Sequence, residues 1–256
     1  MLWNKAAAGM AAVALLCLIA ASGAAPELLP VYSAQTTAAE GPDPAQQGAP
    51  PAESQRRTPE FFVMIDPGHG GSDKGASLGG KLLEKEITLR LARELRKELE
   101  ERGIAARLLR DADIDIPLER RAEITNEQHA AIYVAIHAAR PGRGVRVYFP
   151  LLTAPHQQPV AGRFVPWESA QSGSLSRSQT VAHAVAGELR KKGLTITSLG
   201  LPLRPLNNIV IPAIAVELAP EVDDAQSLEN QKRLNVVATA IAMAIVQIRS
   251  QLGGRP

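Results

Sequence analysis

The sequence predicts an α/β fold: a single domain whose mostly parallel or mixed central sheet is flanked by helices on both faces. Three observations predict it. Two short apolar runs, residues 61–65 and 130–136, are typical of buried strands. Amphipathic helical patterns lie between and after such runs. Strand and helix patterns thus alternate along the chain, which indicates parallel neighbouring strands joined by right-handed crossovers.

The first helix is predicted over residues 84–102, where apolar residues recur every fourth position from Ile87 to Leu99 and Gly103 follows as a C-terminal cap. Pro117 opens a second helix, because proline is favoured in a first helical turn. The last helix has an apolar stripe that can cover one face of the sheet. The remaining predictions are strands at 104–109, 144–149, 195–199 and 213–217 and helices at 118–128, 174–192 and 227–251.

Composition argues for an ordinary globular domain with appendages, because 45% of the 256 residues are hydrophobic and 21% are charged. The formal net charge is +2, and aromatic residues make up only 4% of the chain. The basic residues are scattered rather than clustered on one motif. These features argue against nucleic acid as a partner.

The N-terminal residues carry the layout of an export signal. Lys5 precedes an apolar run, and small residues follow it, so residues 1–25 are predicted to be a signal peptide, with an uncleaved membrane anchor as the alternative. Residues 26–58 are rich in Ala and Pro and predict a disordered linker before a domain at 59–251. The expected location is the periplasm or cell envelope. Cys17 lies in the signal, so the exported part has no disulfide.

Two histidines follow strands of the same character. The first strand stops at Asp66-Pro67-Gly68, which places His69 on a glycine loop just past its C-terminal end, and His137 ends the second apolar run. Parallel strands bring both to the same edge of the sheet, where α/β proteins build their sites. Glu84 opens the first helix. A His, Glu, His set leaves one coordination position open, as catalytic zinc sites do.

In order, Asp66-Pro-Gly-His69-Gly-Gly, Glu84-Lys85 and Ile136-His137-Ala138 resemble the motifs of the zinc-dependent N-acetylmuramoyl-L-alanine amidases of bacterial cell-wall turnover. The resemblance covers roughly residues 61–248. It implies a Zn²⁺ ion held by His69, Glu84 and His137, and Glu217 as the residue that transfers the proton. The reaction it implies is hydrolysis of the amide between N-acetylmuramic acid and L-alanine of the stem peptide, with a water activated by zinc.

The expected partner is therefore peptidoglycan, and the chain is expected to act as a monomer. Nothing in the sequence indicates whether a protein activator controls it. Two other functions stay open: a zinc peptidase or other amidohydrolase on the same scaffold, and a non-catalytic wall-binding regulator.

Several residues compete for the assigned roles. Glu86 rivals Glu84 as a ligand, but the two lie about 200° apart around a helix, so both cannot face one metal. Asp66, beside Pro67, is interpreted as a residue that orients a neighbour. The alternative for Glu217 is a strand-end carboxylate that pairs with Arg204. The remaining histidines of the domain are interpreted as non-ligands: His129, His156 and His183.

The chain departs from the family pattern at two places. Ala139 stands where the family usually has an asparagine, and Leu218-Ala219-Pro220-Glu221 follows Glu217 in place of Gly-Phe and a later asparagine. Both changes put substrate preference in question. The irregular segment 150–173, with Trp167, is predicted to form a wall or movable lid of the groove, or else a surface loop held by Trp167.

Overall fold

The computed structural model describes residues 61–140, 142–152, 167–221 and 225–253. The predicted signal peptide, the linker and most of the proposed lid segment, residues 153–166, lie outside them, so these three remain predictions. Trp167 begins a short 3₁₀ helix, η1 (Trp167–Gly173), in a segment that the sequence predicts as irregular.

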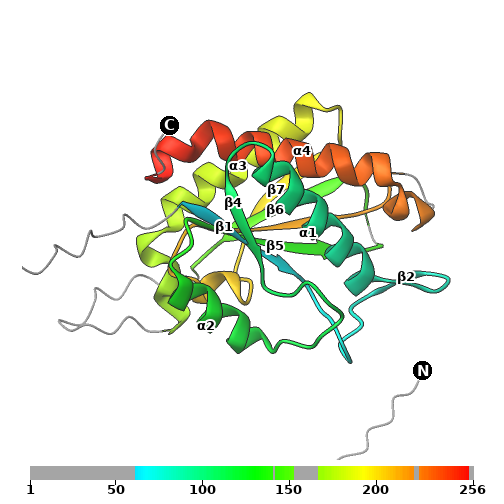
Figure 1. Cartoon of the computed structure of the whole chain (residues 1–256), viewed down its shortest axis with the longest axis horizontal. Helices are drawn as coiled ribbons and strands as arrows, with labels where there is room; N and C mark the ends of the chain where they lie inside the picture. Colours follow the sequence, from blue (N-terminus) through cyan, green and yellow to red (C-terminus); the bar gives the residue numbers. More distant parts are fainter. Residues whose placement is uncertain (1–60, 141, 153–166, 222–224, 254–256) are drawn as a thin grey trace, which may run out of the picture. The chain divides into compact units, whose positions relative to one another are not determined.

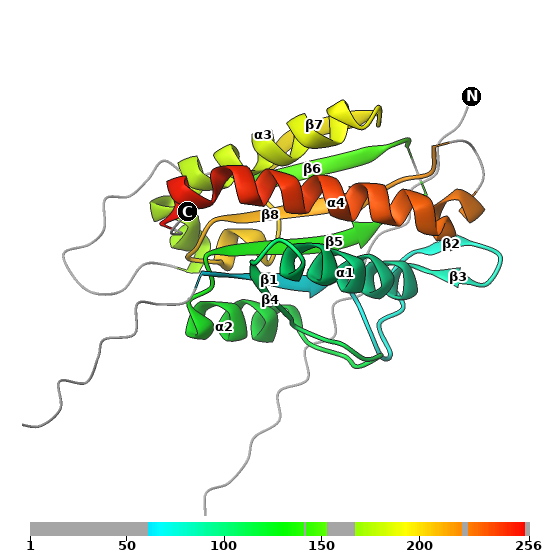
Figure 2. The same cartoon turned by 45° about the horizontal axis from the view of Figure 1, so that its top comes forward.

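The described residues form a six-stranded sheet. Helices cover both of its faces (Figures 1 and 2). Its strand order is β4-β1-β5-β8-β6-β7. The strands are β1 (Phe62–Pro67), β4 (Ala105–Leu108), β5 (Ile132–Ala138), β6 (Val145–Pro150), β7 (Ile196–Leu201) and β8 (Ala213–Leu218). The helices are α1 (Glu84–Glu100), α2 (Leu118–Gln128), α3 (Leu175–Lys191) and α4 (Gln231–Ile248).

The sheet is mixed, and the predicted α/β class is confirmed. β1 pairs in parallel with β4 and β5, and β5 pairs in parallel with β8. β6 runs antiparallel to β8 and pairs in parallel with β7. The predicted β-α-β-α-β unit therefore forms three of the four neighbouring strands that pair in parallel, β4-β1-β5-β8.

Strand residues alternate between two hydrophobic layers, because successive side chains point to opposite faces. The larger layer packs one face of the sheet against α1, α3 and α4, with α4 lying between the other two (Figure 2). The smaller layer, on the opposite face, joins alternate strand residues such as Met64 and Tyr133 to Ala122 of α2 and to the 3₁₀ helix η2 (Leu206–Asn208). Towards the C-terminal ends of the strands this smaller layer gives way to polar side chains.

The stretch Gln231–Leu252, formed by α4 and the 3₁₀ helix η4 (Arg249–Leu252), is the one stretch in the described part of the chain that is long and apolar enough to cross a membrane. Half of its most apolar window is buried inside the domain. The predicted stripe, which includes Leu234, Ile241 and Ile245, is fully buried in the larger layer. These contacts are those of a core helix in a globular domain.

Several short elements differ from the sequence prediction. A small antiparallel hairpin, β2 (Ser77–Gly79) and β3 (Leu82–Leu83), precedes α1, and these strands are too short to show a period in the sequence. In η1, the fully buried Gln171 donates hydrogen bonds to the carbonyls of Ile209 and Ile211 and accepts one from Ser178. These side-chain hydrogen bonds connect η1 to the domain core, and they could not be predicted from the spacing of residues in the sequence. A further 3₁₀ helix, η3 (Ala225–Glu229), precedes α4.

Candidate metal centre

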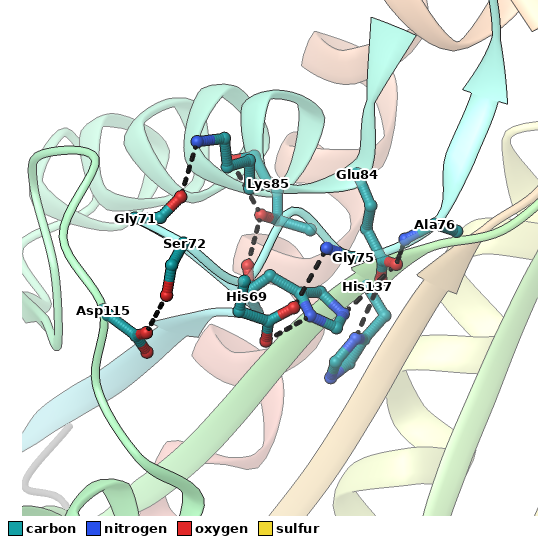
Figure 3. A network of polar contacts seen from close by, with 12 residues as sticks. His69, Gly71, Ser72, Gly75, Ala76, Glu84, Lys85, Asp115 and His137 are labelled. Carbon is teal, nitrogen blue, oxygen red and sulfur yellow. Dashed lines mark hydrogen bonds and ion pairs between the residues drawn. The ribbon is translucent and has the colours of Figure 1, made fainter.

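His69, Glu84 and His137 converge at the C-terminal edge of the parallel strands, as Figure 3 shows. One ligand atom from each lies within 4.8 Å of the other two. His69 Nε2 is 3.1 Å from Glu84 Oε2, and His137 Nδ1 is 3.0 Å from Glu84 Oε1. The two imidazole rings meet edge to face, with centroids 5.3 Å apart. Among the described residues, this is the only group of three such side chains that could hold a metal ion.

The three side chains come from different secondary-structure elements. His137 lies in β5. Because side chains alternate between the two faces of a strand, His137 lies on the same face as the smaller hydrophobic layer. His69 lies two residues beyond β1 in the left-handed region, at φ 63°. Glu84 is the first residue of α1, directly after the hairpin. The predicted meeting of His69 and His137 at one edge follows from the parallel pairing of β1 with β5.

Glu84 is the buried centre of this group. Its Oε2 accepts a hydrogen bond from the Ala76 amide at 2.9 Å, and its Oε1 accepts one from the Ala138 amide at 3.1 Å. Burial alone would raise the pKa of Glu84, but hydrogen bonds with His137, His69 and Ala76 hold that pKa well below its usual value. The carboxylate is therefore charged at neutral pH, as a metal ligand must be.

Asp73 orients the first histidine. Its Oδ2 is 2.8 Å from Nδ1 of His69, the ring nitrogen that faces away from Glu84. If Nδ1 carries the proton, Nε2 presents its lone pair to the metal position, which is the usual carboxylate–histidine arrangement at zinc sites. The hydrogen bond with Glu84 raises the pKa of His69, and Asp73 adds to that rise.

Glycines make room for the two rings. A Cβ on Gly68 would lie 2.6 Å from the His137 ring, and one on Gly75 would lie 2.7 Å from the His69 ring and 2.8 Å from Glu84. Gly75 also has φ 64°, which favours glycine. These two glycines therefore fix how closely the backbone approaches the three side chains.

The geometry fits a zinc ion. At zinc–ligand distances of about 2.0–2.2 Å, neighbouring ligands of a tetrahedral zinc lie roughly 3.4 Å apart. The observed separations of 3.1 Å and 3.0 Å between imidazole nitrogens and carboxylate oxygens are close to that value. Two imidazoles and one carboxylate also form a donor set of the kind found in catalytic zinc sites.

Two buried arginines hold the backbone that carries His69. Arg110 donates to the carbonyls of Pro67 and Gly68, and Arg121 donates to those of Pro67 and His69. Arg121 also forms a buried ion pair with Asp66, and the Tyr133 hydroxyl donates to the same carboxylate. Asp66 therefore points at Arg121 and orients it, in agreement with its interpretation as a residue that positions a neighbour.

The glycine loop after His69 is also held by side chains from α1 and from the segment after β4. Lys85 Nζ donates to the Gly71 carbonyl at 2.9 Å, and Ser72 donates to Asp115 at 2.7 Å (Figure 3). Lys85 Nζ also pairs with Asp113 at 2.6 Å. The neighbour of Glu84 in the Glu-Lys pair thus binds the loop that carries His69. Glu86 is exposed and accepts a hydrogen bond from the Leu83 amide, so it faces away from the site.

Glu217 lies one strand away from His137. The two residues are register partners in β5 and β8, so their side chains stand on the same face about 5 Å apart at the backbone. Glu217 pairs with Arg146 of β6, its register partner on the other side. The alternative pairing with Arg204 is wrong among the described residues, since Arg204 is exposed and Arg146 takes that role.

A pocket of about 170 Å³ opens beside the metal position. His69 and His137 line one part of it, Asp73 and Asp115 another, and the apolar start of α2 with Pro205 a third. The other histidines lie elsewhere: His129 caps the far end of α2, His183 packs against Phe149 from α3, and His156 lies outside the described residues.

Comparison with known proteins decides the family. A family model described as N-acetylmuramoyl-L-alanine amidase matches residues 63–247, which is most of the chain and all of the sheet except its first residue. The chain belongs to the N-acetylmuramoyl-L-alanine amidase family. The matched range contains His69, Glu84, His137 and Glu217.

Individual members of this amidase family are similar to this chain over different lengths. The germination-specific N-acetylmuramoyl-L-alanine amidase of Bacillus subtilis is 27% identical over 76% of this chain and 82% of its own length. AmiC of Escherichia coli is 42% identical, but the match covers 37% of this chain and only 23% of that protein. The solved structure of the amidase AmiC2 of Nostoc punctiforme covers 73% of this chain with 26% identity and a TM-score of 0.56.

The amidase-family positions that depart from the usual pattern adjoin one another in the fold. The Ala139 amide donates to the Leu218 carbonyl, and the Ala219 amide donates to the Gly144 carbonyl. Arg233 at the start of α4 donates to the carbonyls of both Gly144 and Ala219. The altered residues therefore form one largely buried region beside Glu217, between the end of β8 and the start of β6.

Sequence reasoning missed the supporting residues of the amidase site. Asp73 had a signal, since a carboxylate four residues after a loop histidine can reach its ring. Arg110 and Arg121 had none, because buried arginines look like surface ones until the fold is known. Arg146 could have been found from alternation in residues 144–149, but only if the antiparallel pairing with β8 had been known.

We expect Arg121→Met to destabilise the protein by about 3–5 kcal/mol, because it leaves the buried carboxylate of Asp66 without its ion-pair partner. Arg120→Met is the matched control, since Arg120 is exposed and its pair with Glu123 contributes at most about 1 kcal/mol. Urea denaturation of the metal-free proteins measures both. Equal stabilities for the two variants would contradict the stabilising role given to the Arg121–Asp66 ion pair.

Proposed function

We propose that this chain hydrolyses the amide bond between N-acetylmuramic acid and L-alanine of the peptidoglycan stem peptide, with Zn²⁺ held by His69, Glu84 and His137. The observation that carries the proposal is the convergence of these side chains on a family-matched domain, with Glu217 on the same face in the next strand. The chain spans only part of some relatives, so the proposal concerns this domain.

When bound, zinc supplies Lewis acidity: it makes water acidic enough to ionise near neutral pH and polarises a carbonyl group. The protein's own residues supply the rest. Asp73 holds the His69 ring through Nδ1, and the backbone amides of Ala76 and Ala138 hold the Glu84 carboxylate. Glu217 takes a proton from the attacking water and delivers it to the nitrogen of the breaking carbon–nitrogen bond. The products are the lactyl carboxylic acid of the sugar and a peptide with a free L-alanine amine.

The N-terminal residues agree with this substrate. Peptidoglycan lies outside the cytoplasmic membrane, and residues 1–25 have the layout of a signal peptide. A linker over residues 26–58 would let the domain at 59–251 reach some distance from a membrane if the signal stays as an anchor. We propose that the chain is exported and acts on the cell wall as a monomer.

The purified protein is expected to contain one zinc ion per chain, because three ligands of suitable type already face one point. His69→Ala and His137→Ala should each lose most of it, whereas His183→Ala, on a helix elsewhere, should keep it. Elemental analysis after dialysis measures the zinc content. Full zinc in both site variants would show that the metal lies elsewhere.

Glu217→Gln is expected to keep its zinc and its fold but to lose hydrolysis by a factor of about 10² or more, because the amide cannot accept the proton. Mass spectrometry of digested, purified peptidoglycan gives the readout. The wild-type protein should release intact stem peptides that begin with L-alanine. Cleavage within the stem peptide would instead indicate a peptidase, and no cleavage a binding protein.

A further inference from the structure

Arg146 lies beside the proposed proton carrier as a consequence of strand register. β6 runs antiparallel to β8, and Arg146 stands directly opposite Glu217 in that pairing. Glu217 in turn stands opposite His137 in the parallel pairing of β8 with β5. Because residues opposite one another share a face, the three side chains form one row across three strands. Arg146 is the end of the row farthest from the metal position.

Two side chains of β6 bind the same carboxylate oxygen. The Arg146 guanidinium forms an ion pair with Oε1 of Glu217, and the Tyr148 hydroxyl lies 3.4 Å from that oxygen. Burial and the nearby Glu217 charge raise the pKa of Tyr148, which keeps its hydroxyl protonated. Both contacts end on Oε1, so Oε2 is the oxygen that these two side chains leave for other partners.

The protein makes space for this guanidinium. A Cβ on Gly142 would lie 2.6 Å from Nη1 of Arg146, and Gly142 has φ 93°, a conformation that favours glycine. The side chains of Arg146 and Glu217 are 20% and 21% exposed, so the pair is largely removed from solvent. A planar guanidinium in this setting holds a carboxylate in one orientation better than a flexible ammonium does.

We propose that Arg146 is a positioning residue for proton transfer: it holds Oε1 of Glu217 so that Oε2 exchanges the proton with water and the leaving amine. This inference rests on the proposed function of Glu217. In the proposed reaction Oε2 gains the proton of water and loses it to the amine nitrogen, so the carboxylate is regenerated at each turnover. Arg146 takes no proton and touches no reacting atom.

The competing role for Arg146 is direct binding of a substrate carboxylate, and kinetics separates the two. A positioning residue acts on the chemical step, so Arg146→Met should lower kcat on a soluble muramyl peptide by about 10²-fold with little change in KM. Arg146→Lys should recover part of the loss, because it restores the positive charge without the planar fork. Arg107→Met, which removes a strand arginine at the opposite edge of the sheet, should leave both constants unchanged.

A double-mutant cycle tests whether Arg146 acts through Glu217. In the Glu217→Gln background, Arg146→Met should cause no further loss of kcat, since the group that it positions is already gone. Zinc content and melting temperature are measured in every variant to show that the fold and the metal site survive. Tyr148→Phe, a smaller change on the same oxygen, gives a second reading if Arg146→Met does not fold.

Three results would overturn the inference. They are a raised KM at unchanged kcat in Arg146→Met, an equal loss of kcat in the wild-type and Glu217→Gln backgrounds, and a normal kcat in Arg146→Met. Failure of the proposed function itself looks different, because then Glu217→Gln keeps wild-type turnover or the wild-type protein cleaves no muramyl amide.

Discussion

The site depends on one interaction: the buried carboxylate of Glu84, which lies between the imidazoles of His69 and His137. Each oxygen of this carboxylate meets one ring and one backbone amide, from Ala76 or Ala138. A buried, charged carboxylate is stable only when it has such hydrogen-bond partners. It thereby joins three separate parts of the chain, namely the loop between β1 and the hairpin, the start of α1 and the end of β5.

The surrounding polar network stabilises an unusual backbone conformation in the loop after β1. His69, Gly70 and Gly71 are consecutive residues with positive φ, and the first is not glycine. Arg110 and Arg121 bind the carbonyls on one side of this stretch, and Lys85 binds the Gly71 carbonyl on the other. Burying two guanidiniums so close together is costly, which accounts for the lowered pKa of Arg110. These bonds therefore fix the backbone that presents His69.

Local pattern was enough to predict the fold class and the meeting of His69 and His137 at one edge, whereas the choice of Glu84 over Glu86 came from the family resemblance. Apolar strand runs, their abrupt ends and parallel order place His69 and His137 at one edge without further information. The partner of Glu217 was not predictable, because Arg146 reaches it only through the antiparallel pairing of β6 with β8. The buried arginines were missed for a similar reason, since their carbonyl partners are set by tertiary contacts. The periodicity of apolar residues can be read from the sequence, whereas strand register and side-chain burial are known only once the sheet has assembled.

The central claim is that the His69, Glu84 and His137 side chains bind zinc in nearly the arrangement described here. A crystal structure of the protein grown with zinc, with anomalous data collected at the zinc edge, tests it most directly. We expect one strong peak about 2.0–2.2 Å from His69 Nε2, His137 Nδ1 and a Glu84 oxygen. A peak elsewhere, or one bound through Asp66 or Glu86 in place of Glu84, would contradict it.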